Sequence, residues 1–230
     1  MIILDIETKN LEPIGNGLQF GNPQNWKTSC ACIIEVVGPT AQDIEPHVFV
    51  EKDMVAELTS MGIQCKSFEH LPDYLENCLE DELPLLTHNG IGFDLPILSK
   101  TIADGGANCE DVLLRYEQAG LAMDTAADLK KKTGKRFHLQ DLIKGVLSPT
   151  ASKLMNAANA PIEWHNGNYE DVINYCVSDC VLTYQMFYIA GDEGVLEAVP
   201  SKEQNEERVL VADWKTWLEM SARCFKSQDE

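Results

Sequence analysis

The sequence predicts an α/β protein in which strands come first and helices dominate later. Three strand-like runs, Ile2–Thr8, Ser29–Val37 and Ile44–Val50, are separated by segments rich in Gly, Asn and Pro. Beyond them, apolar residues recur at helical spacing, most clearly after Asn168. The chain has 230 residues, which suits one full α/β domain with insertions, so we expect a single domain over residues 1–230.

The first strand carries two carboxylates, Asp5 and Glu7, behind three aliphatic residues. Because strand side chains alternate between faces, both carboxylates should point the same way at the end of a buried strand. Like charges this close and partly desolvated repel, which raises one pKa or demands a cation. The alternative is an edge strand whose Asp and Glu face water.

Residues 9–26 are rich in Gly, Asn and Pro, which predicts a long loop beside the carboxylates. Loops of this length are often functional. The next two strand-like runs flank Gly38 and Pro39, which predicts an antiparallel hairpin. The first three strands should therefore form a meander.

The middle of the chain predicts helices around one short strand. Residues 54–61 and 67–82 have helical spacing, the second behind a Ser67 cap, and Leu83–Thr87 reads as a short buried strand. A turn with two glycines then leads into a helix of roughly ten residues near Asp94.

Residues 105–137 predict short helical stretches broken by glycines. They hold the basic cluster between Lys130 and Arg136, which we interpret first as a solvated helix end and second as a nucleic-acid contact. A helix is expected over 138–146, and irregular chain over 149–167.

The best-signalled helix begins near Asn168 and should end at Gly191. Within it, Tyr175 and Asp179 are four residues apart, so both project from one face. A buried tyrosine hydrogen-bonded to a nearby Asp would also explain the pair. Residues 192–230 form a C-terminal extension, in which 208–214 fits either a strand or a helix.

Charge and cysteine usage narrow the function classes. With 18 basic against 37 acidic residues, the net charge of −19 argues against a protein that coats nucleic acid through a broad basic surface. An enzyme that grips only a strand end is compatible, because bound metal can supply the positive charge. Eight cysteines lack disulfide-type spacing, so reduced, mostly buried thiols are expected. Cys176 and Cys180 lie one helical turn apart without a second ligand pair in the sequence nearby, so no zinc site is expected.

Targeting signals are absent from the sequence as given. No apolar run approaches the ~20 residues of a membrane span. The N-terminus enters a strand at once, leaving no room for a signal peptide. We therefore expect a cytoplasmic protein that does not bind membranes.

The carboxylates in their order, Asp5 and Glu7, then Asp94, then Asp179, resemble the DEDD superfamily of 3′–5′ exonucleases. Tyr175, four residues before the last Asp, resembles the DEDDy branch. Asn89–Leu98 and Tyr175–Cys180 are similar to the second and third motifs of the proofreading domain of family B DNA polymerases. The chain leaves no room for a polymerase, so the resemblance implies a stand-alone exonuclease. It also implies a ribonuclease H-like fold, a mixed five-stranded sheet flanked by helices.

The resemblance implies hydrolysis of phosphodiester bonds by two metal ions, Mg²⁺ or Mn²⁺, and release of 5′-mononucleotides. By this resemblance Asp5 bridges both ions, and Glu7 and Asp179 hold the ion that binds the attacking water. Asp94 acts on the second ion, and Tyr175 orients or helps deprotonate the water. Carboxylates suit these hard cations.

The same resemblance implies a nucleic-acid 3′ end as partner, expected to be single-stranded. Thr8, Asn89 and Phe93 would contact the last nucleotides, Phe93 by stacking, which tolerates any base. Lys153 lies where relatives often have a phosphate-contacting group, although an exposed loop lysine is the alternative. The loop at 9–26 could select single strands, block duplexes or bind a partner.

Two other functions stay open at this level. A catalytically inactive ribonuclease H-like module that binds nucleic acid or protein would be expected to lack the full carboxylate set, which is complete here. A small-molecule nucleotide phosphohydrolase could use the same metals, and turnover of a mononucleotide ester against an oligonucleotide separates it. DNA and RNA are both possible substrates, because no motif here reports contacts to the 2′-OH.

Overall fold

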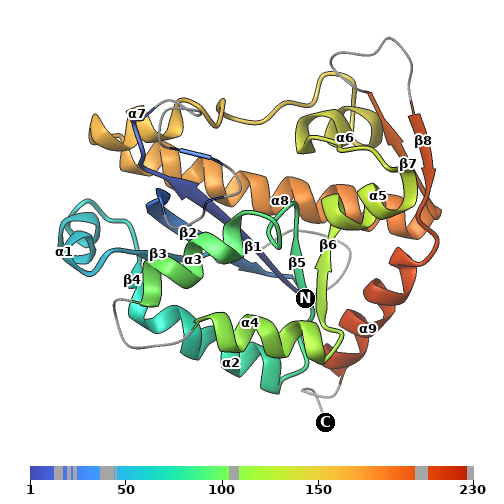
Figure 1. Ribbon diagram of the computed structural model, residues 1–230, viewed down its shortest axis with the longest axis horizontal. Coiled ribbons are helices and arrows are strands. Elements are labelled where there is room, and N and C mark those ends of the chain that lie inside the picture. The colour runs from blue at the N-terminus through green and yellow to red at the C-terminus, as the bar shows by residue number, and fades with distance from the viewer. Residues whose placement is uncertain are drawn as a thin grey trace.

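A six-stranded mixed sheet organises the chain (Figure 1). The computed structural model describes residues 1–12, 18–19, 22, 25–36, 44, 46–103, 109–199 and 207–226. The strand order is β4-β3-β2-β1-β5-β6. The strands are β1 (Ile2–Thr8), β2 (Thr28–Glu35), β3 (Pro46–Val50), β4 (Lys66–Ser67), β5 (Leu85–Thr87) and β6 (Ala122–Asp124).

The first three strands form the expected antiparallel meander, and the later strands join it in parallel. β5 pairs with β1 and β6 pairs with β5, both in parallel. In the described residues the sheet has one strand more than the resemblance implied, because the two-residue β4 adds to β3 at the edge. Two of these strands, β4 and β6, were not expected from the sequence. β4 has only two residues, and β6 lies within residues 105–137, where the spacing and the glycines predicted short helices.

Helices cover both faces of the sheet (Figure 1). α8 packs on β1 and β2 on one face, whereas α2, α3 and α4 pack on the other. The helices are α1 (Lys52–Ser60), α2 (Leu71–Glu80), α3 (Asp94–Ala103), α4 (Cys109–Gln118), α5 (Thr125–Thr133), α6 (Leu139–Val146), α7 (Ala160–His165), α8 (Tyr169–Glu193) and α9 (Trp214–Lys226), with the 3-10 turn η2 (Phe68–His70) before α2. Among the described helices, none is long and apolar enough to cross a bilayer.

Two expectations about the later part of the chain are wrong. The stretch 149–167 is not irregular throughout, because α7 lies within it. α8 does not end at Gly191 but continues to Glu193 and stops at Gly194, whose φ of 71° is left-handed. Gly191 instead makes room for α9, since a Cβ there would lie 3.0 Å from Leu218 Cδ1.

The C-terminal segment contains both a strand and a helix where the sequence allowed either. β7 (Val195–Ala198) and β8 (Glu207–Leu210) form an antiparallel pair, and α9 follows. Part of the basic cluster is used here: Lys132 pairs with Asp128 at 2.5 Å and with Asp213 at 2.7 Å. Lys135 pairs with Glu207. These two lysines therefore connect α5 and the residues directly after it to the C-terminal segment.

Candidate active site

β1 supplies two carboxylates from one face near its end. The side chains of Asp5 and Glu7 lie on the face that α8 covers, as alternation along a strand requires. Glu7 is only 7 % exposed. The register with β2 shifts between Glu7 and Thr8, so regular pairing breaks directly after the second carboxylate.

α8 brings a third carboxylate to this face. The carboxylate oxygens of Asp5, Glu7 and Asp179 all lie within 4.8 Å of one another. Asp179 is 3 % exposed and Tyr175, one turn before it, is fully buried. Residues 174 positions apart in the sequence therefore form one compact acidic group.

Several polar atoms of this group lack a hydrogen-bond partner among the described residues. They are Asp5 Oδ2, Asp179 Oδ1 and the Tyr175 hydroxyl, each shielded from solvent. A buried polar atom without a partner costs about 1–3 kcal/mol, more when charged. Divalent cations such as Mg²⁺ take carboxylate oxygens as ligands and would satisfy these atoms. The donor set therefore fits a hard divalent cation.

Lys153 balances part of the negative charge. Its ammonium forms an ion pair with Asp179 and lies 4.9 Å from the centre of the Tyr175 ring. The Lys153 side chain is 21 % exposed, so the interpretation as an exposed loop lysine is wrong. Its backbone N–H donates to Gln140 Oε1 at 3.0 Å, which fixes the loop against α6.

The carboxyl groups are electrostatically strained. Burial raises the pKa of Asp5 well above its usual range, and Asp94 and Asp179 raise it further. The pKa of Glu7 rises for the same reasons, burial first and Asp5 second. Burial also raises the pKa of Asp179, while Lys153 opposes that rise. A divalent cation would reverse these shifts, because it favours the ionised form of every ligand.

Asp94 lies beside the acidic group rather than within the compact trio. It begins α3, is 6 % exposed, and has a pKa raised to about 8 by burial and by Asp124. Asp94 raises the pKa of Asp5, which places the two carboxyls in one electrostatic site.

Asp124 holds the glycine turn that delivers Asp94, and the sequence reading missed it. Its carboxylate accepts hydrogen bonds from the backbone N–H groups of Asn89 at 3.0 Å and Ile91 at 2.8 Å. It also caps α5 by accepting from Ala127 N at 2.9 Å. The sequence signal that could have identified Asp124 was its position directly before α5, where an Asp often caps the helix. At Gly90 a Cβ would lie 2.5 Å from Thr87 Cβ, so the turn requires glycine there.

The residues expected to contact substrate lie at the end of β1 and in the turn before α3. Asn89 has a left-handed φ of 68° in the turn, and Thr8 is buried at the end of β1. Phe93 is partly exposed and meets Trp26 edge-on, with ring centres 4.9 Å apart. Trp26 closes the 9–26 loop, where its indole N–H donates to Gln19 O at 3.0 Å. The described part of this loop therefore abuts the turn of Asn89 and Phe93.

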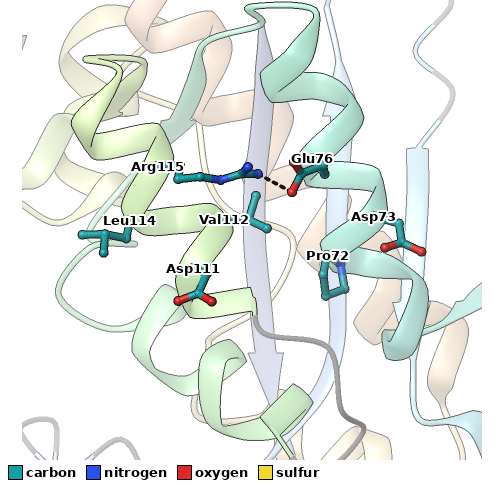
Figure 2. A pocket seen from close by; sticks show the side chains of 7 residues that line it. All are labelled: Pro72, Asp73, Glu76, Asp111, Val112, Leu114 and Arg115. Carbon is teal, nitrogen blue, oxygen red and sulfur yellow. Dashed lines mark ion pairs between the residues drawn. The ribbon is translucent and has the colours of Figure 1, made fainter.

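A separate hollow of about 540 Å³ lies on the opposite side of the sheet, between α2 and α4 (Figure 2). Arg115 and Glu76 form an ion pair across it. None of the site carboxylates lines it. The lining residues are Pro72, Asp73, Glu76, Asp111, Val112, Leu114 and Arg115.

Comparison with solved structures reveals the same fold in a larger protein. The family B DNA polymerase of the hyperthermophilic archaeon Pyrobaculum calidifontis matches with a TM-score of 0.51 and 16 % identity, over 80 % of this chain and 23 % of the polymerase. E. coli exonuclease I in complex with a dA16 oligonucleotide matches with a TM-score of 0.47 and 11 % identity, over 83 % of this chain and 40 % of that chain. The polymerase likeness shows that this chain shares the mixed α/β fold of part of that polymerase.

This chain spans less than half the length of either matched protein. No protein-family model and no curated protein matches the sequence.

Proposed function

We propose that this protein is a metal-dependent 3′–5′ exonuclease that releases 5′-mononucleotides from a nucleic-acid 3′ end. The observation that carries the proposal is the trio Asp5, Glu7 and Asp179, of which Glu7 and Asp179 are buried. Their carboxylate oxygens lie within 4.8 Å of one another, and two of these oxygens lack partners in the described chain. A fold shared with part of a DNA polymerase supports it. The polarity rests on the resemblance of the three motifs.

The trio would hold Mg²⁺ or Mn²⁺, with Asp94 available to a second ion. When bound, such ions supply charge stabilisation and activate water for attack on phosphorus. Lys153 now neutralises Asp179, so cation binding would release its ammonium from that ion pair. The freed ammonium could then contact a phosphate oxygen of the substrate.

Tyr175 positions water rather than removing its proton. Burial raises the pKa of this phenol far above its usual range, with Asp179 adding to the shift, so the hydroxyl is neutral at working pH. It is fully buried beside the Asp179 carboxylate. A neutral hydroxyl can donate to or accept from a water beside Asp179, and so fixes the direction of attack.

The strand end would lie along the turn of Asn89 and Phe93. Phe93 offers an aromatic face for the terminal base, and Trp26 braces its edge. Contacts of this kind tolerate any base and favour an unpaired strand, whose bases are free to stack. A broad basic surface is not required for this mode of binding, in line with the net charge of −19.

The deciding experiment digests 5′-labelled oligonucleotides, single-stranded and duplex, DNA and RNA, with Mg²⁺, Mn²⁺ or EDTA. We expect a ladder that shortens from the 3′ end only with metal, and no reaction when the 3′ end carries a phosphate. Cutting of a circular single strand would contradict the polarity. Turnover of a mononucleotide ester without turnover of oligonucleotides would instead establish a small-molecule phosphohydrolase.

Site variants in the same assay distinguish hydrolysis by this protein from hydrolysis by a contaminating nuclease. Glu7→Gln should lose the reaction, because it removes one carboxylate of the trio. Asp73→Asn, in the hollow between α2 and α4, should retain it and serves as the matched control. Equal activity in both variants would refute the assignment of the site.

A further inference from the structure

Three thiols lie directly beside the carboxylates on the same face of the sheet. Cys30 and Cys32 of β2 pair in register with Glu7 and Asp5 of β1. Cys176 reaches them from α8, and the three sulfur atoms all lie within 4.8 Å of one another. All three residues are fully buried free thiols. The expectation of no zinc site beside Cys176 and Cys180 considered only their sequence neighbours, whereas in the fold β2 supplies two further thiols.

We propose that Cys30, Cys32 and Cys176 form a binding site for one thiophilic divalent cation of the Zn²⁺ or Cd²⁺ class. A Zn–S bond of ~2.3 Å places the sulfurs of a trigonal or tetrahedral site about 3.8–4.0 Å apart. The observed limit of 4.8 Å is larger than that spacing by about 1 Å at most. Binding of the cation would therefore draw each pair of sulfur atoms together by no more than that difference.

The thiol site differs in chemistry from the carboxylate site beside it. Thiolates are soft ligands that select Zn²⁺ and its heavier relatives, whereas the oxygens of Asp5 and Glu7 suit Mg²⁺ or Mn²⁺. The two sites are nevertheless in direct contact, since Cys176 Sγ donates a hydrogen bond to the backbone carbonyl of Asp5 at 3.4 Å. A soft cation and a hard cation can therefore occupy neighbouring positions without sharing donors.

A fourth thiol lies at the rim of the cluster. Cys180 follows Cys176 by one helical turn and donates through its sulfur to the backbone carbonyl of Cys32 at 3.5 Å. Together with Cys180, the cluster thus places two cysteines of β2 opposite two of α8. A cation held there would cross-link the two elements that enclose Asp5, which should stabilise the fold.

Titration with Cd²⁺ in a large excess of Mg²⁺ tests this proposal, because Mg²⁺ occupies oxygen sites and Cd²⁺–thiolate bonds absorb in the ultraviolet. We expect one equivalent of Cd²⁺ per chain, an ultraviolet charge-transfer band and a higher melting temperature. Cys32→Ala and Cys176→Ala, made separately and checked for folding by circular dichroism, should each weaken Cd²⁺ binding by at least about tenfold. Cys109→Ala, a buried thiol of α4 on the opposite face, is the matched control and should bind normally.

X-ray absorption on the wild-type protein with one equivalent of Cd²⁺ provides a test that needs no variant. Three or four sulfur neighbours support the site, whereas a shell of oxygen alone overturns it. Loss of binding in Asp179→Asn with retention in Cys32→Ala would also overturn it, because the cation would then sit on the carboxylates. None of these readouts uses nuclease activity, so the thiol site and the exonuclease proposal fail independently.

Discussion

The two faces of β1 differ in what they contribute. On one face Ile2, Leu4 and Ile6 are at most 5 % exposed and pack under α2, α3 and α4. On the other face Asp5 and Glu7 lie beneath α8 with raised pKa values. The same strand therefore supports the core with Ile2, Leu4 and Ile6 and carries the two carboxylates of the candidate site on its other face. Neighbouring residues of β1 therefore serve different purposes, one packing in the core and the next lying in the candidate site.

Asp5→Asn should have the largest effect, and it should act on the function of one face of β1 without lowering the stability of the fold. The change keeps the side-chain volume but removes a charge from the centre of the acidic group, so exonuclease activity should fall to background. The melting temperature measured in EDTA should stay equal or rise, because repulsion with Asp94 and Asp179 is relieved. A folded Asp5→Asn protein with near-wild-type rate would contradict the metal assignment.

Tyr175→Phe should slow hydrolysis by ~10²–10⁴-fold while metal and substrate binding change little. The hydroxyl lies beside the Asp179 carboxylate without a hydrogen bond of good geometry among the described residues, so its removal should cost little stability. Rate and melting temperature measured on one preparation decide the matter. If the hydroxyl only supported the fold, the variant would stay active and lose the ~1 kcal/mol of a hydrogen bond.

Leu4→Ala probes the opposite face. Leu4 is 1 % exposed, and its truncation leaves a cavity that should lower the free energy of unfolding by about 2–5 kcal/mol. The rate per folded molecule, measured well below the melting transition, should change far less than in Asp5→Asn. Leu210→Ala on β8, where the residue is 74 % exposed, is the control and should leave both quantities unchanged.

A further expected effect is a pH dependence of stability in EDTA. The pKa of Asp94 rises from its usual 3.8 to about 8 in the fold. The folded protein thus holds this proton more tightly than the unfolded chain, so Asp94 stabilises fully below pH 3.8 and loses that contribution as pH rises through about 8. Urea unfolding across this range should show the decline, and Asp94→Asn should flatten it. If stability changed with pH equally in the variant and the wild type, Asp94 would not be one of the carboxyls whose pKa the fold raises.

Local patterns were sufficient where a signal repeats along one element. Alternation along a strand predicted that Asp5 and Glu7 share a face, and helical spacing predicted that Tyr175 and Asp179 do. β6 was not predicted, because it lies between helices in a stretch whose local spacing favoured short helices. Gly191 was misread because its close contact with α9 involves a segment more than twenty residues away in the sequence.

The sequence by itself determined which residues offer carboxylates, which elements carry them and which way they face. Only the tertiary structure decided what lies opposite them: Lys153 on Asp179, Asp124 under the turn of Asn89, and the thiols of β2 against α8. The physical reason is range. Backbone alternation and helical period act over a few residues, whereas these contacts depend on how α8 and the loops pack onto the sheet, which no local pattern encodes.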